Sequence, residues 1–171
     1  VIVMPDADLD KAATAIHGGA FGSTGQRCTA TSRVIAHPDV KRALLDRLVA
    51  SAEKIKVGPG LDPSMDMGPS IADKQWQSVL NYIEAGKQGG ARLLTGGTRP
   101  DHLSAGYFIA PTIFDDVTPG MKIFQEEIFG PVLSVATASS LDDALAKANA
   151  VEYGLTTSIF TQDVNTVLRF I

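Results

Sequence analysis

Short uninterrupted apolar runs alternate along this chain with longer segments whose apolar residues recur at helical spacing. The runs are rich in β-prone residues, and three of them are followed directly by proline, glycine or aspartate, which is typical of buried strands. We expect extended structure at Val1–Met4, Arg33–Ala36, Ala91–Thr95, Tyr107–Phe114, Pro131–Ala136 and Thr156–Phe160. Strands that alternate with helices indicate an α/β fold. We therefore expect a doubly wound, mainly parallel sheet flanked by helices.

The helical segments lie between these runs. Asp6 or Asp8 can cap the first helix, whose apolar face carries Leu9, Ala12, Ala13, Ile16 and Ala20. Glycines at positions 18, 19 and 22 should weaken its end, where it leads into the loop around Cys28. Further helices are expected at Val40–Ile55, Ile71–Ala85 and Leu141–Ala150. No internal repeat or low-complexity linker divides the chain, so residues 1–171 are expected to form one domain.

Composition narrows the class of protein. A hydrophobic content of 44% and a charged content of 20% are ordinary for a globular protein. The net charge of −4 and the dispersed basic residues argue against a nucleic-acid partner. No apolar run approaches the roughly 20 residues that span a bilayer, so no membrane partner is expected. A lone cysteine forms no internal disulfide, which is compatible with a reducing compartment, and we expect a cytoplasmic protein.

Both ends of the chain look cut. Val1 stands in what reads as the middle of a strand, and Phe170-Ile171 closes an apolar-periodic stretch without a capping residue. We expect either a piece of a longer protein or termini that contacts elsewhere stabilise.

The single cysteine lies in a stretch that suits a nucleophile. Cys28 follows Gly22-Ser23-Thr24-Gly25-Gln26-Arg27, which is loop chemistry rather than a core strand. Arg27 and Arg33 flank it and favour the reactive thiolate. The glycines allow a tight turn whose backbone N–H groups can face an oxyanion. The competing interpretation is a small buried hydrophobic residue, the usual place of an unpaired cysteine.

A second stretch, Gln125 to Val132, places two carboxylates beside an aromatic residue and a Gly-Pro turn. Glu126 or Glu127 can hold the hydroxyl groups of a ligand while Phe129 packs on a flat ring. The alternative is that both glutamates are solvated and Phe129 belongs to the core.

Metal chemistry has little support in the sequence. The three histidines are scattered, and no two stand at helical spacing or beside the cysteine, so we expect no metal site. A histidine partner for Cys28 is not excluded, but nothing favours one of the three. The glycines near Cys28 lack the strand-to-helix setting and the lysine of a phosphate-binding loop.

Taken together, these motifs resemble the aldehyde dehydrogenase superfamily. The resemblance extends over essentially the whole chain and is carried by several specific motifs in the right order. These are Val3-Met4-Pro5-Asp6-Ala7-Asp8-Leu9-Asp10, Gly25-Gln26-Arg27-Cys28-Thr29, Met67-Gly68-Pro69, Gly106-Tyr107-Phe108-Ile109-Ala110-Pro111-Thr112, Glu126-Glu127-Ile128-Phe129-Gly130-Pro131-Val132 and Tyr153-Gly154-Leu155.

The resemblance implies roles for three residues. Cys28 would be the nucleophile, attacking an aldehyde to give a thiohemiacetal and then, after hydride transfer to NAD or NADP, a thioester that is hydrolysed to a carboxylic acid. Glu127 matches the glutamate that holds the nicotinamide-ribose hydroxyls, and Phe129 matches the aromatic residue beside the nicotinamide. The parent enzyme is expected to form a homo-oligomer, a dimer or a tetramer.

The resemblance also implies that parts of the family's catalytic set lie outside this chain. The general-base glutamate of the family precedes the position where Val1 begins, and the oxyanion-hole asparagine lies further upstream. The dinucleotide-binding domain and the strand that helps members pair are absent as well. We therefore interpret residues 1–171 as a truncated, cysteine-bearing catalytic domain with little or no dehydrogenase activity by itself.

The substrate prediction rests on Arg27, which can attract a substrate carboxylate or phosphate. The string from Gly25 to Arg33 looks like dehydrogenases of acid semialdehydes, the 2-oxoglutarate semialdehyde type in particular, whereas pairing of Arg27 with a structural carboxylate or solvent is equally compatible. Two other functions stay open. One is a coenzyme-A-acylating semialdehyde dehydrogenase that uses the same thioester, and the other is a non-catalytic binding or assembly fragment.

Overall fold

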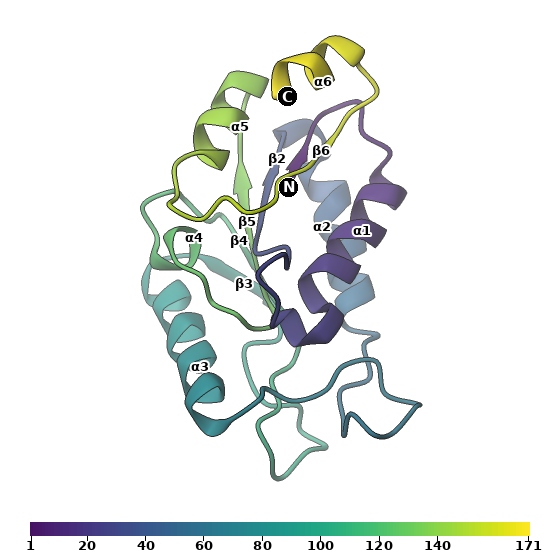
Figure 1. Ribbon diagram of the computed structural model, residues 1–171, viewed down its shortest axis with the longest axis vertical. Coiled ribbons are helices and arrows are strands. Elements are labelled where there is room, and N and C mark those ends of the chain that lie inside the picture. The colour runs from purple at the N-terminus through teal and green to yellow at the C-terminus, as the bar shows by residue number, and fades with distance from the viewer.

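Six strands form one sheet in the computed structural model, which describes residues 1–171 (Figure 1). Their order across the sheet is β3-β4-β5-β2-β1-β6. The strands are β1 (Ile2–Val3), β2 (Arg33–Ala36), β3 (Arg92–Thr95), β4 (Thr112–Asp115), β5 (Val132–Thr137) and β6 (Ile159–Phe160). Every neighbouring pair is parallel except β3 and β4, which are antiparallel. The predicted α/β fold with a mainly parallel sheet is confirmed.

Helices cover both faces of this sheet (Figure 1). The helices are α1 (Leu9–Phe21), α2 (Pro38–Ala52), α3 (Asp73–Gln88), α4 (Lys122–Gln125), α5 (Leu141–Ala148) and α6 (Val164–Phe170). In the view of Figure 1, α1 and α2 lie on one side of the sheet, and α3, α4 and α5 lie on the other. The arrangement is the doubly wound one that the sequence pattern predicts.

Strands β2 and β5 are mostly apolar because both of their faces are buried. In β2, Val34 and Ala36 join the apolar cluster beneath α1 and α2, whereas Ile35 joins the cluster beneath α3, α4 and α5. Strand β5 divides in the same way, with Leu133 and Val135 on the first side. Side chains of a strand alternate between its faces, so a two-sided core requires apolar residues at consecutive positions.

Several predicted elements have different bounds, and for two of them the reason is visible. Extended structure was expected from Tyr107, but β4 begins at Thr112 because the backbone before Pro111 bonds to other loops, with Ser70 N–H donating to the Tyr107 carbonyl at 2.9 Å. Helix α3 begins at Asp73 rather than at Ile71, because the backbone of Ala72 is extended, with a φ of −158° and a ψ of 165°.

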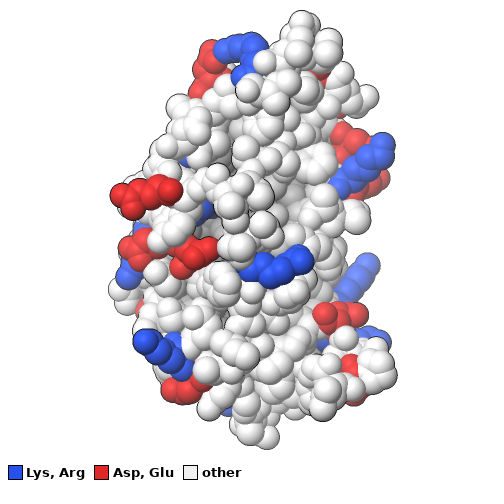
Figure 2. Space-filling model, in the orientation of Figure 1, with Lys and Arg blue, Asp and Glu red and all other residues white.

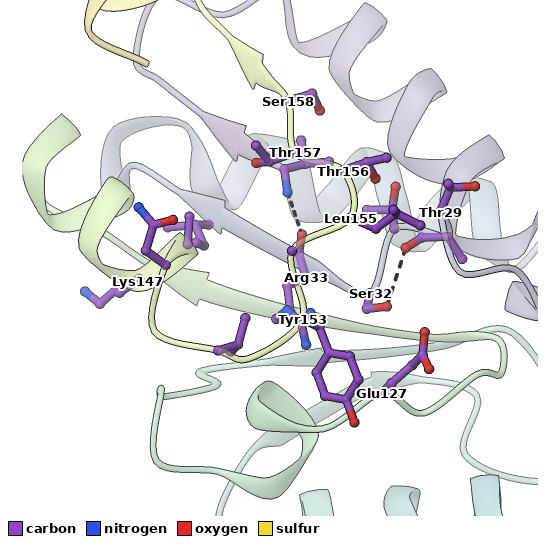
Figure 3. Close-up of a pocket in the computed structure, with 18 of the residues that line it drawn as sticks. Thr29, Ser32, Arg33, Glu127, Lys147, Tyr153, Leu155, Thr156, Thr157 and Ser158 are labelled. Atoms are coloured by element: carbon purple, nitrogen blue, oxygen red, sulfur yellow. Dashed lines mark hydrogen bonds between the residues drawn. The ribbon is translucent and has the colours of Figure 1, made fainter. Parts of the chain in front are cut away.

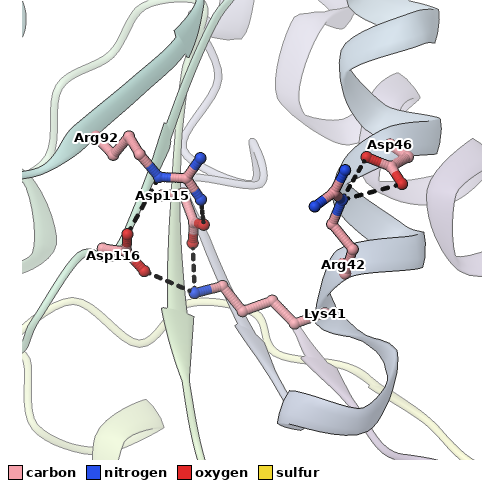
Figure 4. A network of polar contacts seen from close by, with 6 residues as sticks. All are labelled: Lys41, Arg42, Asp46, Arg92, Asp115 and Asp116. Carbon is pink, nitrogen blue, oxygen red and sulfur yellow. Dashed lines mark hydrogen bonds and ion pairs between the residues drawn. The ribbon is translucent and has the colours of Figure 1, made fainter.

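An ion network ties α2 to the edge of the sheet (Figure 4). Asp115, at the end of β4, is 1% exposed and lies 2.6 Å from both Lys41 Nζ of α2 and Arg92 Nη2 of β3. Asp116 contacts the same two cations, at 3.0 and 3.2 Å. Burial lowers the pKa of Lys41, but its hydrogen bonds to the two aspartates outweigh burial and leave that pKa above the ordinary value. The network thus neutralises a carboxylate that is withdrawn from water.

None of the helices combines the length and the apolar character that a bilayer crossing requires. On the face shown in Figure 2, acidic and basic side chains stand in mixed groups along the sides of the molecule.

Candidate active site

The loop that carries Cys28 begins with an unusual backbone turn. Helix α1 ends at Phe21, and the turn η1 (Gly22–Gly25) follows it. Ser23, Thr24 and Gly25 take φ values of 55°, 59° and 64°, in the left-handed region that a β-branched residue such as threonine rarely occupies. Such strain persists only where surrounding contacts enforce it, and it clusters at functional sites. We call residues 22–31 the cysteine loop.

Side-chain hydrogen bonds enforce the turn. Thr24 Oγ1 donates to the Gly68 carbonyl at 3.1 Å, and the Gln26 side chain donates to the Pro69 carbonyl at 3.3 Å. The Ile71 N–H donates to Gln26 Oε1 at 2.9 Å. The loop is therefore fixed to residues 68–71 by three bonds that span more than forty positions of sequence.

Cys28 is exposed and lines a cavity of about 520 Å³. Arg33 and Glu127 line the same cavity, and so does the segment Tyr153–Ser158, which borders it in the view of Figure 3. An exposed thiol beside open space rules out the interpretation of Cys28 as a packed core residue. A small molecule has room to approach the sulfur.

Glu127 belongs to residues 126–130, which we call the glutamate segment. It follows α4 and leads into β5. Tyr82 of α3 donates to Glu126 Oε2 at 2.7 Å, and this hydrogen bond raises the pKa of Tyr82 to about 12. Gln75 of the same helix donates to the carbonyls of Ile128 and Phe129. Helix α3 thus holds the segment along one side.

The cysteine loop and the glutamate segment meet backbone to backbone. A Cβ atom added to Gly25 would stand 2.2 Å from the Gly130 carbonyl oxygen, closer than any real contact. A Cβ atom on Gly130 would stand 2.5 Å from a methyl group of Val79 in α3. Glycine at position 25 lets the two backbones approach this closely and also supplies the left-handed conformation. Glycine at position 130 lets the segment pack against Val79. This contact brings Cys28 and Glu127 to one cavity.

Arg33 is a cation of the cavity with a fixed position and a charged neighbour. Its Nη1 donates to the Phe124 carbonyl at 2.9 Å. Burial lowers the pKa of Arg33, and the negative charge of Glu127 opposes that effect. The Glu127 carboxylate is exposed and lines the cavity, where it is available to a ligand.

The other predicted site residues have different surroundings. Phe129 is 36% exposed and has a φ of 57°, and Arg27 is exposed; neither lines the cavity. The sequence alone did not distinguish Glu126 from Glu127. In the structure the Glu126 carboxylate accepts a hydrogen bond from Tyr82. No three His, Cys, Asp or Glu side chains gather closely enough to hold a metal ion.

Sequence reasoning missed Gln75 and Tyr82. Both stand on the face of α3 that also carries the buried Val79 and Ile83, at helical spacing. A polar residue on an otherwise apolar helix face is the signal that identifies such positions.

Comparisons with known proteins find relatives over nearly the whole chain. The sequence model described as "Aldehyde dehydrogenase family" matches residues 1–171. The alpha-ketoglutaric semialdehyde dehydrogenase of Bacillus subtilis is 46% identical over 173 aligned residues, which cover 100% of this chain and 36% of that protein. The peroxisomal aminoaldehyde dehydrogenase 1 of Malus domestica is 44% identical, over 99% of this chain and 34% of that protein.

Solved structures share the fold closely. The NAD-dependent aldehyde dehydrogenase of Sinorhizobium meliloti is 41% identical with a TM-score of 0.95, covering 99% of this chain and 33% of that one. The betaine aldehyde dehydrogenase of Staphylococcus aureus, solved in complex with NAD+, is 33% identical with a TM-score of 0.95, covering 99% of this chain and 33% of that one. The chain spans about a third of the length of the curated relatives it matches.

Proposed function

Because this chain belongs to the aldehyde dehydrogenase family, we propose that the protein containing it oxidises an aldehyde to a carboxylic acid with NAD or NADP as the oxidant. Residues 1–171 contribute the cysteine-bearing catalytic domain. One observation carries the proposal: an exposed thiol and an available carboxylate, 99 positions apart in sequence (127 − 28), line a single cavity. A cysteine with a purely structural role requires neither the open cavity nor the strained cysteine loop.

The proposed chemistry begins at Cys28. Its thiolate adds to the aldehyde carbon, and the resulting oxyanion is stabilised by backbone N–H groups of the cysteine loop. When bound, NAD or NADP supplies the hydride acceptor for the next step. Oxidation leaves a thioester on Cys28, and water hydrolyses this thioester to release the acid and restore the thiol. Exposure of the sulfur to the cavity serves both the aldehyde and the water.

The residues present fit a dinucleotide. The Glu127 carboxylate faces the cavity and can accept hydrogen bonds from ribose hydroxyls. The Phe129 ring, two positions further along the chain, is partly exposed and can pack against a flat ring. The complex of the Staphylococcus aureus relative with NAD+ supports the same cofactor class.

We propose an acid semialdehyde as the substrate, with Arg27 attracting its distal charge. The similarity to a semialdehyde dehydrogenase supports this choice. An Arg27→Ala variant should lose catalytic efficiency on anionic aldehydes and keep it on neutral ones of similar length. Equal losses on both kinds of aldehyde would contradict the role of Arg27.

The function itself is tested with the complete protein that the gene encodes. Formation of reduced dinucleotide and of carboxylic acid should require Cys28, so Cys28→Ser should lower kcat by about a thousandfold or more. An iodoacetamide probe should label Cys28 faster than it labels an unstructured peptide thiol. A Cys28→Ser variant with unchanged turnover would refute the mechanism.

Two alternatives have their own readouts. Product analysis with and without coenzyme A separates hydrolysis from acyl transfer, because only the second yields a coenzyme A thioester. Residues 1–171 alone should show little or no turnover, and a probe reaction no faster than that of the peptide thiol would favour a binding or assembly role.

Two further properties of the complete protein remain predictions. Light scattering tests the expected homo-oligomer. The cytoplasmic location rests on the lone cysteine, and the relatives include proteins named as peroxisomal and chloroplastic.

A further inference from the structure

Gln75 is a half-buried polar residue in the first turn of α3 that bonds to nothing but the glutamate segment. Its Nε2 donates to the Phe129 carbonyl at 2.9 Å and to the Ile128 carbonyl at 3.1 Å. A glutamine amide nitrogen carries two N–H donors, which is enough for both of these consecutive carbonyls. No other donor in the chain reaches either carbonyl.

The two carbonyls belong to a turn that needs support. Phe129 is held at a φ of 57°, a conformation that costs an ordinary L-residue about 1–2 kcal/mol. Neither Ile128 nor Phe129 lies in a helix or strand, so no ladder bond fixes their backbone. Removing both donors leaves the part-buried Ile128 carbonyl without its protein partner and the exposed Phe129 carbonyl to water, and it frees the turn to leave the left-handed region.

The contacts on either side of the turn do not depend on Gln75. Tyr82 holds Glu126 at one end, and Gly130 packs against Val79 at the other. Ile128 itself is buried in the core. Loss of Gln75 should therefore change the orientation of Glu127 and Phe129 without detaching the segment from α3.

We propose that Gln75 is a positioning residue for dinucleotide binding. By bonding to both carbonyls it fixes the backbone from which Glu127 and Phe129 project, and it sets the direction of both side chains before a dinucleotide arrives. This inference rests on the proposed function, since it assigns Gln75 to the same site. The Gln75 side chain does not itself line the cavity, so it acts from α3 through the glutamate segment.

Variants of the complete protein test this role. Gln75→Leu keeps about the same volume and removes both donors, and Gln75→Glu keeps the shape but directs carboxylate oxygens at the carbonyls. Gln77→Leu is the matched control, because Gln77 is an exposed glutamine of the same helix that makes no hydrogen bond through its side chain. Titration calorimetry measures the Kd of NAD and of NADP without aldehyde, steady-state kinetics measures both KM values, and urea unfolding measures stability.

We expect both Gln75 variants to raise the dinucleotide Kd and its KM by about tenfold or more, while the aldehyde KM stays within about twofold. Gln77→Leu should match the wild type in every measurement. The free energy of unfolding should fall by no more than the free energy of dinucleotide binding does.

An unchanged dinucleotide Kd in Gln75→Leu would overturn the inference while the proposed function stands. A general decline, in which both KM values and stability change together, would show a merely structural role and would also overturn it. A wild-type protein that binds neither dinucleotide would overturn the proposed function and this inference with it.

Discussion

Replacing Gly25 with alanine tests the contact that unites the two halves of the candidate site. The new methyl group would stand 2.2 Å from the Gly130 carbonyl oxygen and 3.0 Å from the Ala20 carbonyl oxygen. Both obstacles are backbone, so no side chain can rotate away. The cysteine loop and the glutamate segment must separate by more than an ångström to restore an ordinary contact.

The magnitude has two sources. A left-handed φ of 64° costs alanine about 1–2 kcal/mol relative to glycine. Overpacking in a closely fitted region adds about 1–3 kcal/mol. We therefore expect Gly25→Ala to lower the free energy of unfolding by about 2–5 kcal/mol, a large part of the roughly 5–15 kcal/mol that domains have.

Gly18→Ala is the matched control. Gly18 lies in α1 with ordinary φ, and an added Cβ meets nothing within 4 Å. The same substitution there should raise stability by about 0.5–1 kcal/mol, because alanine suits a helix better than glycine.

Urea unfolding of the wild type and the two variants gives the comparison, and the dinucleotide Kd reports the separation of the two segments. Opposite signs for the two substitutions are expected. Equal midpoints for Gly25→Ala and the wild type would refute the contact.

Two further predictions concern the ionisable groups. Because the folded protein holds the pKa of Tyr82 at about 12, above the ordinary 10, the hydrogen bond to Glu126 contributes fully below about pH 10 and is lost as the pH rises towards 12; the stability difference between wild type and Tyr82→Phe should shrink across that range in urea titrations. Lys41→Met leaves the buried Asp115 with one cation instead of two and should cost about 3 kcal/mol, whereas Arg42→Met removes an exposed pair and should cost less than about 1 kcal/mol; equal midpoints in thermal unfolding would contradict this.

Local patterns predicted the elements well because they depend on residues close in sequence. The run Arg33–Ala36 is a strand with the predicted bounds, since its apolar residues fill both faces of the sheet. Helix α1 continues through Gly18 to Phe21 although glycine weakens isolated helices, because its buried face supplies the stabilisation. The antiparallel pairing of β3 was not predicted, because strand direction depends on how the chain returns to the sheet edge.

The site was predictable only as separate halves. Cys28 and Glu127 each stood out from their neighbours, and the family resemblance assigned both, but no local pattern shows that they share a cavity. Arg27 and Arg33 both flank Cys28 in the sequence, and the substrate prediction chose Arg27, but only the fold shows that Arg33 and not Arg27 lines the cavity. Gln75 bonds to the backbone carbonyls of Ile128 and Phe129. Every residue has such a carbonyl, so the residue types at these two positions do not reveal the bonds.

The approach of Gly25 to Gly130 limits how the candidate site can be redesigned. A library that randomises residues 22–28 alone would keep the opposing backbone where it is, so most members would be sterically incompatible with it. Productive redesign should exchange the two segments together as one cassette, or leave both glycines fixed and diversify the cavity wall at Tyr153–Ser158 instead.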